Sequence, residues 1–393
     1  MTLHEGPFLT APATTVDSSS NRFDDRGRVT VNPASTPAQY CVYYDRTGSG
    51  RRVGSGMNIG EIARRAGVSR STVSYALSGK RPVSAATVQR INDVIAELGY
   101  RPNASARALA EGRTRTLGLV VPPASRRLTD VQLGFVGSVV DAAAAHDLDV
   151  LLSPSGGDHD RSFERIVTGR RVDGVILMEI LLEDPRVERL SQASLPFVTI
   201  GHVEHPGASW WVDVDYGGLI TRCVHHLADL GHEEVVLISR SAELVAAGYG
   251  PALRSATGFL EATAERGLTA RMVCCADEAA AGLACFEQLR TQWPGVTAAV
   301  TINEAALPGV QRALHRAGLE VPRDFSLTGV IAERLAEDFH PPLTAADVPA
   351  ADLGRLAVDL LLAQIADRSA EPRHALLEPP ISLRSSTGAR PRG

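Results

Sequence analysis

Side chains suited to recognising nucleic acid are gathered in one short stretch of the sequence, from Glu61 to Tyr75. The spacing of the apolar residues predicts that Arg70, Ser71, Ser74 and Tyr75 share the outer face of a helix. An arginine can hold the edge of a guanine with two hydrogen bonds, and hydroxyl groups can bond to base edges or phosphates. The stretch is therefore a candidate surface for contacting double-stranded DNA; the alternative is a small helical bundle with a charged surface.

Three short helices are predicted to position these side chains, within residues 59–98. Gly67 supplies the turn between the first two helices, Ser69 is a predicted N-cap of the second, and Ser84 is a predicted N-cap of the third. A helix, a tight glycine turn and a second helix are typical of the helix-turn-helix, in which the second helix lies in the major groove.

The charge distribution favours the same interpretation. The formal net charge is −5, but residues 57–116 are rich in arginine whereas residues 117–393 are acidic. A basic module ahead of an acidic body is expected of a protein that meets a polyanion through that module alone.

Beyond residue 116, short β-branched runs alternate with alanine-rich helical stretches. These repeated βα units are too many for one compact sheet, so we expect a doubly wound α/β body of two lobes with a cleft. The predicted strands are Leu117–Val121, Val150–Ser153, Gly174–Met178, Phe197–Ile200, Val235–Ser239, Ala298–Ile302 and Phe325–Val330. Predicted helices between them include Gly134–His146, Gly217–Leu230, Ala256–Arg266 and Leu307–Ala317.

Several blocks of the sequence resemble the lactose-repressor (LacI-type) family of bacterial transcription regulators. The blocks are MNIGEIARRAGVSRSTVSYALSGKRPVS, LGYRPNASARAL, RTRTLGLVVP, VDGVILMEI, VDVDYGGLITRCVHHLADLGHEEVVLIS and PPLTAADVP. The resemblance implies an N-terminal three-helix helix-turn-helix DNA-binding domain and an α/β two-lobed periplasmic-binding-protein-like domain. The implied segments are a headpiece of residues 57–102, a hinge helix and linker of residues 103–116, an effector-binding and dimerisation body of residues 117–387, and a tail of residues 388–393.

Residues 1–56 show neither helical nor strand periodicity and are rich in Ser, Thr, Pro, Gly and Arg. We expect them to be a disordered extension or, because Met57 stands directly before the first patterned segment, an upstream start-site artefact.

The resemblance also implies how DNA is held. In this family a hinge folds into a short helix on operator DNA, and two such helices wedge a pair of leucines into the minor groove. Here the hinge is residues 103–110, and Leu109 matches the wedge. The predicted DNA-contacting residues are Asn58, Ser69, Arg70, Ser71, Thr72, Ser74, Tyr75, Ser78, Asn103, Ala106 and Leu109.

The body of this family resembles sugar-binding proteins that hold an effector between two lobes joined by three crossovers. By that likeness the crossovers lie near residues 213–216, 341–344 and 377–380. Ligands of α/β proteins bind at the carboxyl ends of strands. The effector-binding candidates are accordingly Glu179, His202, Arg254, Asn303 and Glu304.

One segment departs from the family pattern. The strand end that usually reads Gly-aromatic-Asp-Asp is Gly329-Val330-Ile331-Ala332 here, so both carboxylates are missing. This departure supports an alternative in which the regulator is constitutive and its body only dimerises. A second alternative is a sugar-binding protein that does not bind DNA.

Other function classes find no support in the sequence. There is no apolar run of membrane-spanning length and no signal-peptide pattern, which predicts a cytoplasmic protein. The five cysteines form no CxxC pair, and no nucleophile or phosphate-loop motif is present, so we expect no metal, no cofactor and no enzyme activity. The predicted function is a homodimeric, sequence-specific transcriptional regulator, with repression as the expected direction. It would bind near-palindromic operator DNA and respond to a sugar-like effector.

Overall fold

The computed structural model describes residues 59–78, 81–98, 113–123, 127–155 and 160–391. The predicted extension of residues 1–56 and the predicted hinge of residues 103–110 lie outside the described residues. In the described part of the chain, no helix combines the length and apolar character needed to cross a membrane.

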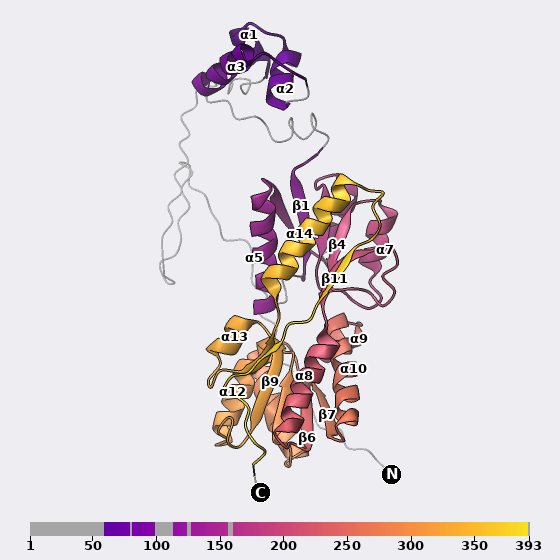
Figure 1. Ribbon diagram of the computed structural model, residues 1–393, viewed down its shortest axis with the longest axis vertical. Coiled ribbons are helices and arrows are strands. Elements are labelled where there is room, and N and C mark those ends of the chain that lie inside the picture. Colours follow the sequence, from indigo (N-terminus) through magenta and orange to yellow (C-terminus); the bar gives the residue numbers. More distant parts are fainter. Residues whose placement is uncertain (1–58, 79–80, 99–112, 124–126, 156–159, 392–393) are drawn as a thin grey trace, which may run out of the picture. The chain divides into compact units, whose positions relative to one another are not determined.

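Three helices precede the first strand among the described residues: α1 (Ile59–Ala66), α2 (Arg70–Ser78) and α3 (Ala85–Leu98) (Figure 1). Each contributes a fully buried side chain to one small core, namely Ile62, Val73 and Ile91. The helices are too short to be stable alone, so this shared apolar contact holds them together.

The predicted turn and caps of these helices are confirmed. Gly67 has a φ of +66°, which L side chains rarely adopt, and this lets the chain turn sharply between α1 and α2. The hydroxyl of Ser69 accepts a hydrogen bond of 3.1 Å from the backbone N–H of Thr72. The hydroxyl of Ser84 accepts one of 3.3 Å from the backbone N–H of Thr87.

The remainder of the described chain forms two sheets of six strands each, which define two lobes. In lobe 1 the strand order is β11-β5-β4-β3-β1-β2, and in lobe 2 it is β12-β10-β9-β8-β6-β7. All neighbouring strands are parallel except β10 and β12. The strands of lobe 1 are β1 (Thr116–Val121), β2 (Asp149–Pro154), β3 (Gly174–Leu177), β4 (Phe197–Ile200), β5 (Trp210–Val214) and β11 (His374–Leu377). Those of lobe 2 are β6 (Glu234–Ser239), β7 (Thr269–Cys274), β8 (Ala298–Thr301), β9 (Ser326–Ile331), β10 (Thr344–Asp347) and β12 (Ile381–Ser382).

Helices cover the sheets and complete the α/β architecture expected from the sequence (Figure 1). Lobe 1 contains α5 (Asp130–Ala145), α6 (Asp160–Gly169), α7 (Pro185–Gln192) and α14 (Ala350–Ala366). Lobe 2 contains α8 (Tyr216–Asp229), α9 (Ala242–Ala246), α10 (Gly250–Glu265), α11 (Ala279–Gln292), the 3₁₀ turn η2 (Glu304–Ala306), α12 (Leu307–Arg316) and α13 (Glu333–Asp338).

Helices α5 and α14 lie against each other although they are far apart in the sequence (Figure 1). A side chain at Gly354 would come within 1.7 Å of the hydroxyl of Ser138, so the two helices require glycine at this point. The same hydroxyl donates a 3.0 Å hydrogen bond to the carbonyl of Ala350.

The chain crosses between the lobes three times. The first crossing follows β5 near residue 215, and the third lies between β11 and β12, both where the sequence predicted them. The prediction of the second crossing at residues 341–344 is wrong. Thr344 begins β10, which pairs with β9 and keeps the chain in lobe 2, so the crossing occurs between Asp347 and Ala350.

Candidate functional site

The outer face of α2 carries the predicted DNA-contacting side chains. Arg70 and Ser71 are exposed, whereas Val73 is fully buried. Ser74 and Tyr75 are half-buried, and the guanidinium of Arg81 lies 5.2 Å from the centre of the Tyr75 ring. The helix therefore turns its apolar side to α1 and α3 and leaves Arg70 and Ser71 accessible to a partner.

Two further candidates on this face also have a structural task. The hydroxyl of Ser69 lies 2.8 Å from the hydroxyl of Ser71 and 2.8 Å from that of Thr72, besides capping α2. The predicted DNA contacts Asn58, Asn103, Ala106 and Leu109 and the side chain of Ser78 lie outside the described residues.

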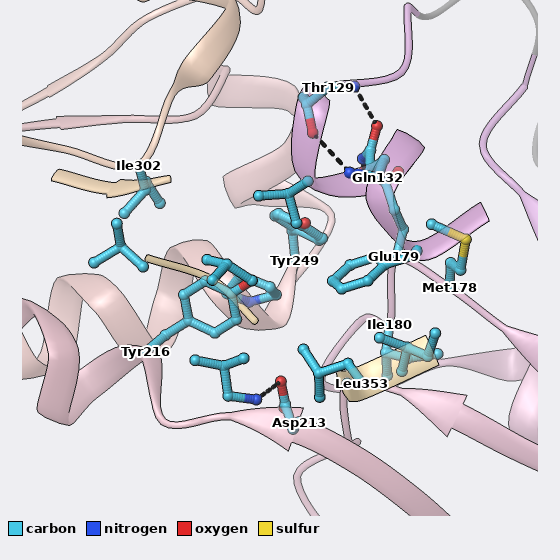
Figure 2. Close-up of a pocket in the computed structure, with 18 of the residues that line it drawn as sticks. Thr129, Gln132, Met178, Glu179, Ile180, Asp213, Tyr216, Tyr249, Ile302 and Leu353 are labelled. Carbon is cyan, nitrogen blue, oxygen red and sulfur yellow. Dashed lines mark hydrogen bonds between the residues drawn. The ribbon is translucent and has the colours of Figure 1, made fainter. Parts of the chain in front are cut away.

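A cavity is lined by residues of both lobes, at the carboxyl ends of their strands (Figure 2). Its volume is about 50 Å³. Lobe 1 contributes Thr129, Val131, Gln132, Phe135, Met178, Glu179, Ile180, Ile200, Gly201, Asp213, Val214 and Leu353, and the second crossing contributes Val348. Lobe 2 contributes Tyr216, Arg240, Tyr249, Pro251, Ile302, Glu304 and Val330.

Two of the predicted effector-binding residues, Glu179 and Glu304, line this cavity. Glu179 follows β3 and has a φ of +53°, a strained conformation for a residue with a side chain. The side-chain amide of Gln132 donates a hydrogen bond to its carboxylate. Gln132 is itself fixed in a reciprocal capping pair with Thr129 at the start of α5 (Figure 2).

Glu304 is a deeply buried carboxylate of the cavity, with 6% of its surface exposed. One carboxylate oxygen accepts a hydrogen bond of 2.6 Å from the backbone N–H of Ala332, and the other accepts one of 3.1 Å from the backbone N–H of Val131. Burial raises the pKa of the Glu304 carboxyl, while the two N–H groups and a hydrogen bond with the side chain of Thr129 act in the opposite direction.

His202 and Arg254 do not line the cavity but surround a residue that does, Asp213. The Nδ1 atom of His202 lies 2.7 Å from an Asp213 oxygen, and its backbone N–H donates to the same oxygen at 3.2 Å. Arg254 donates a 3.0 Å hydrogen bond to the carbonyl of His202 and lies 3.9 Å from Asp213. These two candidates therefore position Asp213 rather than face the cavity.

The structure places Asn303 away from the cavity as well. It is 1% exposed, and its side-chain amide donates to the carbonyls of Cys275 at 2.8 Å and Ser239 at 3.3 Å. Its side-chain oxygen accepts from the backbone N–H of Ala306 at 3.2 Å. Asn303 thus ties three segments together and fixes the turn that carries Glu304.

Several polar or aromatic lining residues were missed by the sequence analysis, chiefly Arg240, Tyr249, Tyr216 and Gln132. Arg240 directly follows β6, so the strand-end rule could have found it. The rings of Tyr216 and Tyr249 face the same space (Figure 2). Burial raises the pKa of Tyr216 well above its usual value, so its hydroxyl stays protonated and can donate a hydrogen bond.

The cavity can therefore offer acceptors and donors beside aromatic surface. Glu179, Asp213 and Glu304 supply carboxylates, and Arg240 supplies a guanidinium. Polar groups that converge next to aromatic faces are what a polyhydroxylated small molecule requires. Within the described residues, no cluster of three or more His, Cys, Asp or Glu side chains could hold a metal ion.

The sequence matches two family models. Residues 58–103 match "Bacterial regulatory proteins, lacI family", and residues 224–387 match "Periplasmic binding protein-like domain". The transcriptional regulator AglR of Rhizobium meliloti (strain 1021) is 30% identical over 344 residues, covering 85% of this chain and 95% of AglR. The transcriptional regulator CelR of Thermobifida fusca is 30% identical over 338 residues, covering 83% of this chain and 96% of CelR.

Solved structures agree in fold. A complex of the transcriptional regulator CelR with cellobiose has a TM-score of 0.63 at 27% identity, covering 84% of this chain and 99% of that one. The lac repressor dimer bound to operator and the anti-inducer ONPF has a TM-score of 0.75 at 22% identity, covering 85% of this chain and 100% of that one.

Proposed function

This chain belongs to the lacI family of bacterial regulatory proteins, and from that premise we propose that it is a DNA-binding transcriptional regulator controlled by a small-molecule effector. The observation that carries the proposal is α2, which buries Val73 and exposes Arg70 and Ser71 within the matched segment. An exposed arginine on the second helix of this motif can reach base edges in the major groove. We propose residues 57–102 as the headpiece and residues 103–116 as the hinge and linker.

The protein acts as a homodimer on near-palindromic operator DNA. A two-fold symmetric dimer presents two copies of α2, so its DNA site has the same symmetry. The lac repressor structure that shares this fold is a dimer on operator DNA. A chromosomal regulator of this kind acts in the bacterial cytoplasm, where its operator is. We propose repression as the direction of regulation.

The effector site is the cavity lined by Glu179, Asp213, Arg240 and Glu304. The rings of Tyr216 and Tyr249 supply apolar faces beside these polar groups, which favours a sugar or a related polyhydroxylated metabolite. The relative CelR is known in complex with cellobiose. The relatives are regulators, and accordingly we treat the cavity as a binding site rather than a catalytic one.

Regulation follows from the three crossings between the lobes. A ligand that prefers one arrangement of the lobes shifts the equilibrium toward it, by no more than its difference in affinity for the two arrangements. Because β1 follows directly after the predicted hinge and linker, a change in lobe arrangement alters the spacing of the two hinges in the dimer.

A second candidate is a constitutive regulator whose body only dimerises. The absence of a carboxylate at Ile331 and Ala332 and the small volume of the cavity, about 50 Å³, favour it. Both candidates bind DNA and differ only in their response to metabolites.

Selection of genomic DNA fragments with the full 393-residue chain, at fixed salt, tests the proposal. We expect recovery of a near-palindromic site, followed by its release or tightening when cellobiose and monosaccharides are titrated in. A site that no small molecule affects would support the constitutive candidate. Failure to recover any site would contradict the DNA-binding function and leave a sugar-binding protein.

A further inference from the structure

The carboxylate of Glu304 joins the two lobes. Its contact with Ala332, at 2.6 Å, lies within lobe 2, whereas its contact with Val131, at 3.1 Å, reaches the start of α5 in lobe 1. The group is almost completely buried, so both hydrogen bonds are shielded from water. Hydrogen bonds to a buried charged group are stronger than those between neutral groups.

The lobes are also joined by backbone hydrogen bonds. The backbone N–H of Leu182 donates to the carbonyl of Gly248 at 2.8 Å, and the N–H of Gly250 donates to the carbonyl of Ile180 at 3.0 Å. These bonds join the segment after β3 to the start of α10. Two separate sets of hydrogen bonds between the lobes therefore involve residues that line the cavity or neighbour its lining residues.

This closed arrangement leaves little free space. A buried water molecule needs about 10–15 Å³, so a cavity of about 50 Å³ has room for only a few water molecules. Pockets that take small-molecule ligands usually measure about 300 Å³ or more. A sugar can enter only when the lobes move apart, and the contacts between them must break for this to happen.

We propose that Glu304 is a latch that holds the two lobes in this closed arrangement, and that effector entry requires the release of its bond to Val131. This inference deepens the proposed function, because it assigns control of effector entry to one residue of the same cavity. A carboxylate can form such a latch because it has two acceptor oxygens. In Glu304 each of these oxygens accepts a hydrogen bond from one backbone N–H group.

Glutamine is the sharpest substitution for testing the latch. It has the size of glutamate but only one acceptor oxygen, and its NH₂ group would face one of the two N–H donors. The single oxygen should keep the shorter contact, at 2.6 Å to Ala332 within lobe 2. Glu304→Gln should therefore lose the 3.1 Å bond to Val131 in lobe 1 without leaving a hole in the structure. Glu304→Asp keeps the charge but is one methylene shorter and cannot span both donors.

A matched control is available on α13. Glu337→Gln makes the same chemical change in lobe 2 at an exposed side chain. The ion pair between Arg334 and Asp130 also joins the lobes, but the arginine side chain is 71% exposed, and solvated pairs of this kind contribute little. Of these two side-chain contacts between α5 and lobe 2, Glu304 is therefore the one whose loss should be measurable.

The experiment is a distance measurement between spin labels in the full-length, ligand-free protein. Labels are attached to cysteines introduced by Glu188→Cys on α7 and Glu261→Cys on α10, both exposed positions, with Cys41 and Cys274 replaced by serine. We expect one narrow distance distribution for the parent and for Glu337→Gln. In Glu304→Gln a longer distance should appear, with the open fraction raised about tenfold, the change expected for one hydrogen bond to a charged group.

An unchanged distribution in Glu304→Gln would overturn the latch, and so would a parent protein that is already open. If Glu304→Gln fails to fold by circular dichroism, Glu304→Asp decides the question by the same readout. DNA binding of the parent is measured separately on the selected fragments. Loss of the latch and loss of the proposed function are therefore distinguishable, because the distance measurement does not depend on DNA.

Discussion

The guanidinium of Arg240 lies 5.3 Å from the centre of the Tyr249 ring, and both residues line the cavity. Asp277 holds the same guanidinium through two hydrogen bonds of 2.8 and 3.2 Å. The arginine is 6% exposed, so its charge is fixed at the cavity wall by a carboxylate and a ring. A fixed charge of this kind sets the orientation of any ligand beside it.

Removing Asp277, the ion-pair partner of the buried Arg240, should destabilise the two-lobed part of the protein. We expect Asp277→Ala to lower the free energy of unfolding by about 3 kcal/mol, because it leaves Arg240 buried without its carboxylate. Urea unfolding measures the change. The double variant Asp277→Ala/Arg240→Met should recover most of the loss; an equal loss in both variants would show that the ion pair is not the cause.

The exposed face of α2 predicts a change in DNA specificity. Arg70→Ala should cost about 1–3 kcal/mol on the preferred site and relax the choice of base at one position of each half-site. Selection from random DNA measures this directly. Arg113→Ala is the comparison, because an exposed arginine that touches only phosphate should weaken binding to all sequences alike. Recovery of the parent motif with Arg70→Ala would refute the base-reading role.

Because the core of the headpiece is small, one large-to-small substitution in it should abolish DNA binding. Ile62 is fully buried, and Ile62→Ala should cost about 2–5 kcal/mol, enough to unfold a three-helix unit of this size. We expect operator binding to be lost while the body keeps its thermal unfolding transition. Asn92→Ala, an exposed change on α3, should leave both properties intact. Retention of operator binding by Ile62→Ala would contradict the prediction.

Stability should fall in mild acid because of His232. Burial lowers the pKa of this histidine, and its ring nitrogens bond to the hydroxyls of Thr297 at 2.8 Å and Ser326 at 3.1 Å. The unfolded chain binds a proton near its ordinary pKa of about 6.5, whereas the folded protein resists protonation. The contribution of His232 to the free energy of unfolding is therefore constant above about pH 6.5 and decreases as the pH falls below that value.

Thermal unfolding between pH 7.5 and pH 5 measures this dependence. His232→Gln should reduce the slope below about pH 6.5, because glutamine does not titrate. Burial also lowers the pKa of His226, so part of the slope should remain. An unaltered slope in His232→Gln would assign the effect to other groups.

The parallel strands could be predicted from the sequence because they are buried on both faces. Each predicted strand is present, with its ends displaced by one residue or none, and β3, β4 and β8 are fully buried runs. Of the strands not predicted, β5 (Trp210–Val214) is fully buried, but Asp213 interrupts its apolar run. β7 (Thr269–Cys274) is an edge strand with exposed side chains, and β10 (Thr344–Asp347) is built from small residues with weak strand preference.

The candidate site was predictable only in part, for a different reason. Glu179 and Glu304 follow strands, and the strand-end rule found them. Gln132 lies in the first turn of a helix and Tyr249 directly before another, and nothing in the local sequence marks them. Their presence at the cavity depends on how the two lobes close on each other, which no short segment encodes. The hydrogen bonds of Asn303 to the carbonyls of Ser239 and Cys275 also join segments that are far apart in the sequence, so they could not be predicted from the local sequence.

Because the chain crosses between the lobes three times, the parts of the protein can be completed only in a certain order during synthesis on the ribosome. Residues 59–98 emerge before the two lobes and can form their core early, but lobe 1 begins at β1 and is complete only when α14 and β11 have been made. Until then the edge of β5 has no neighbour on one side. A chain released before residue 377 would carry a finished DNA-binding unit on a body with an open strand edge, the form most prone to aggregate.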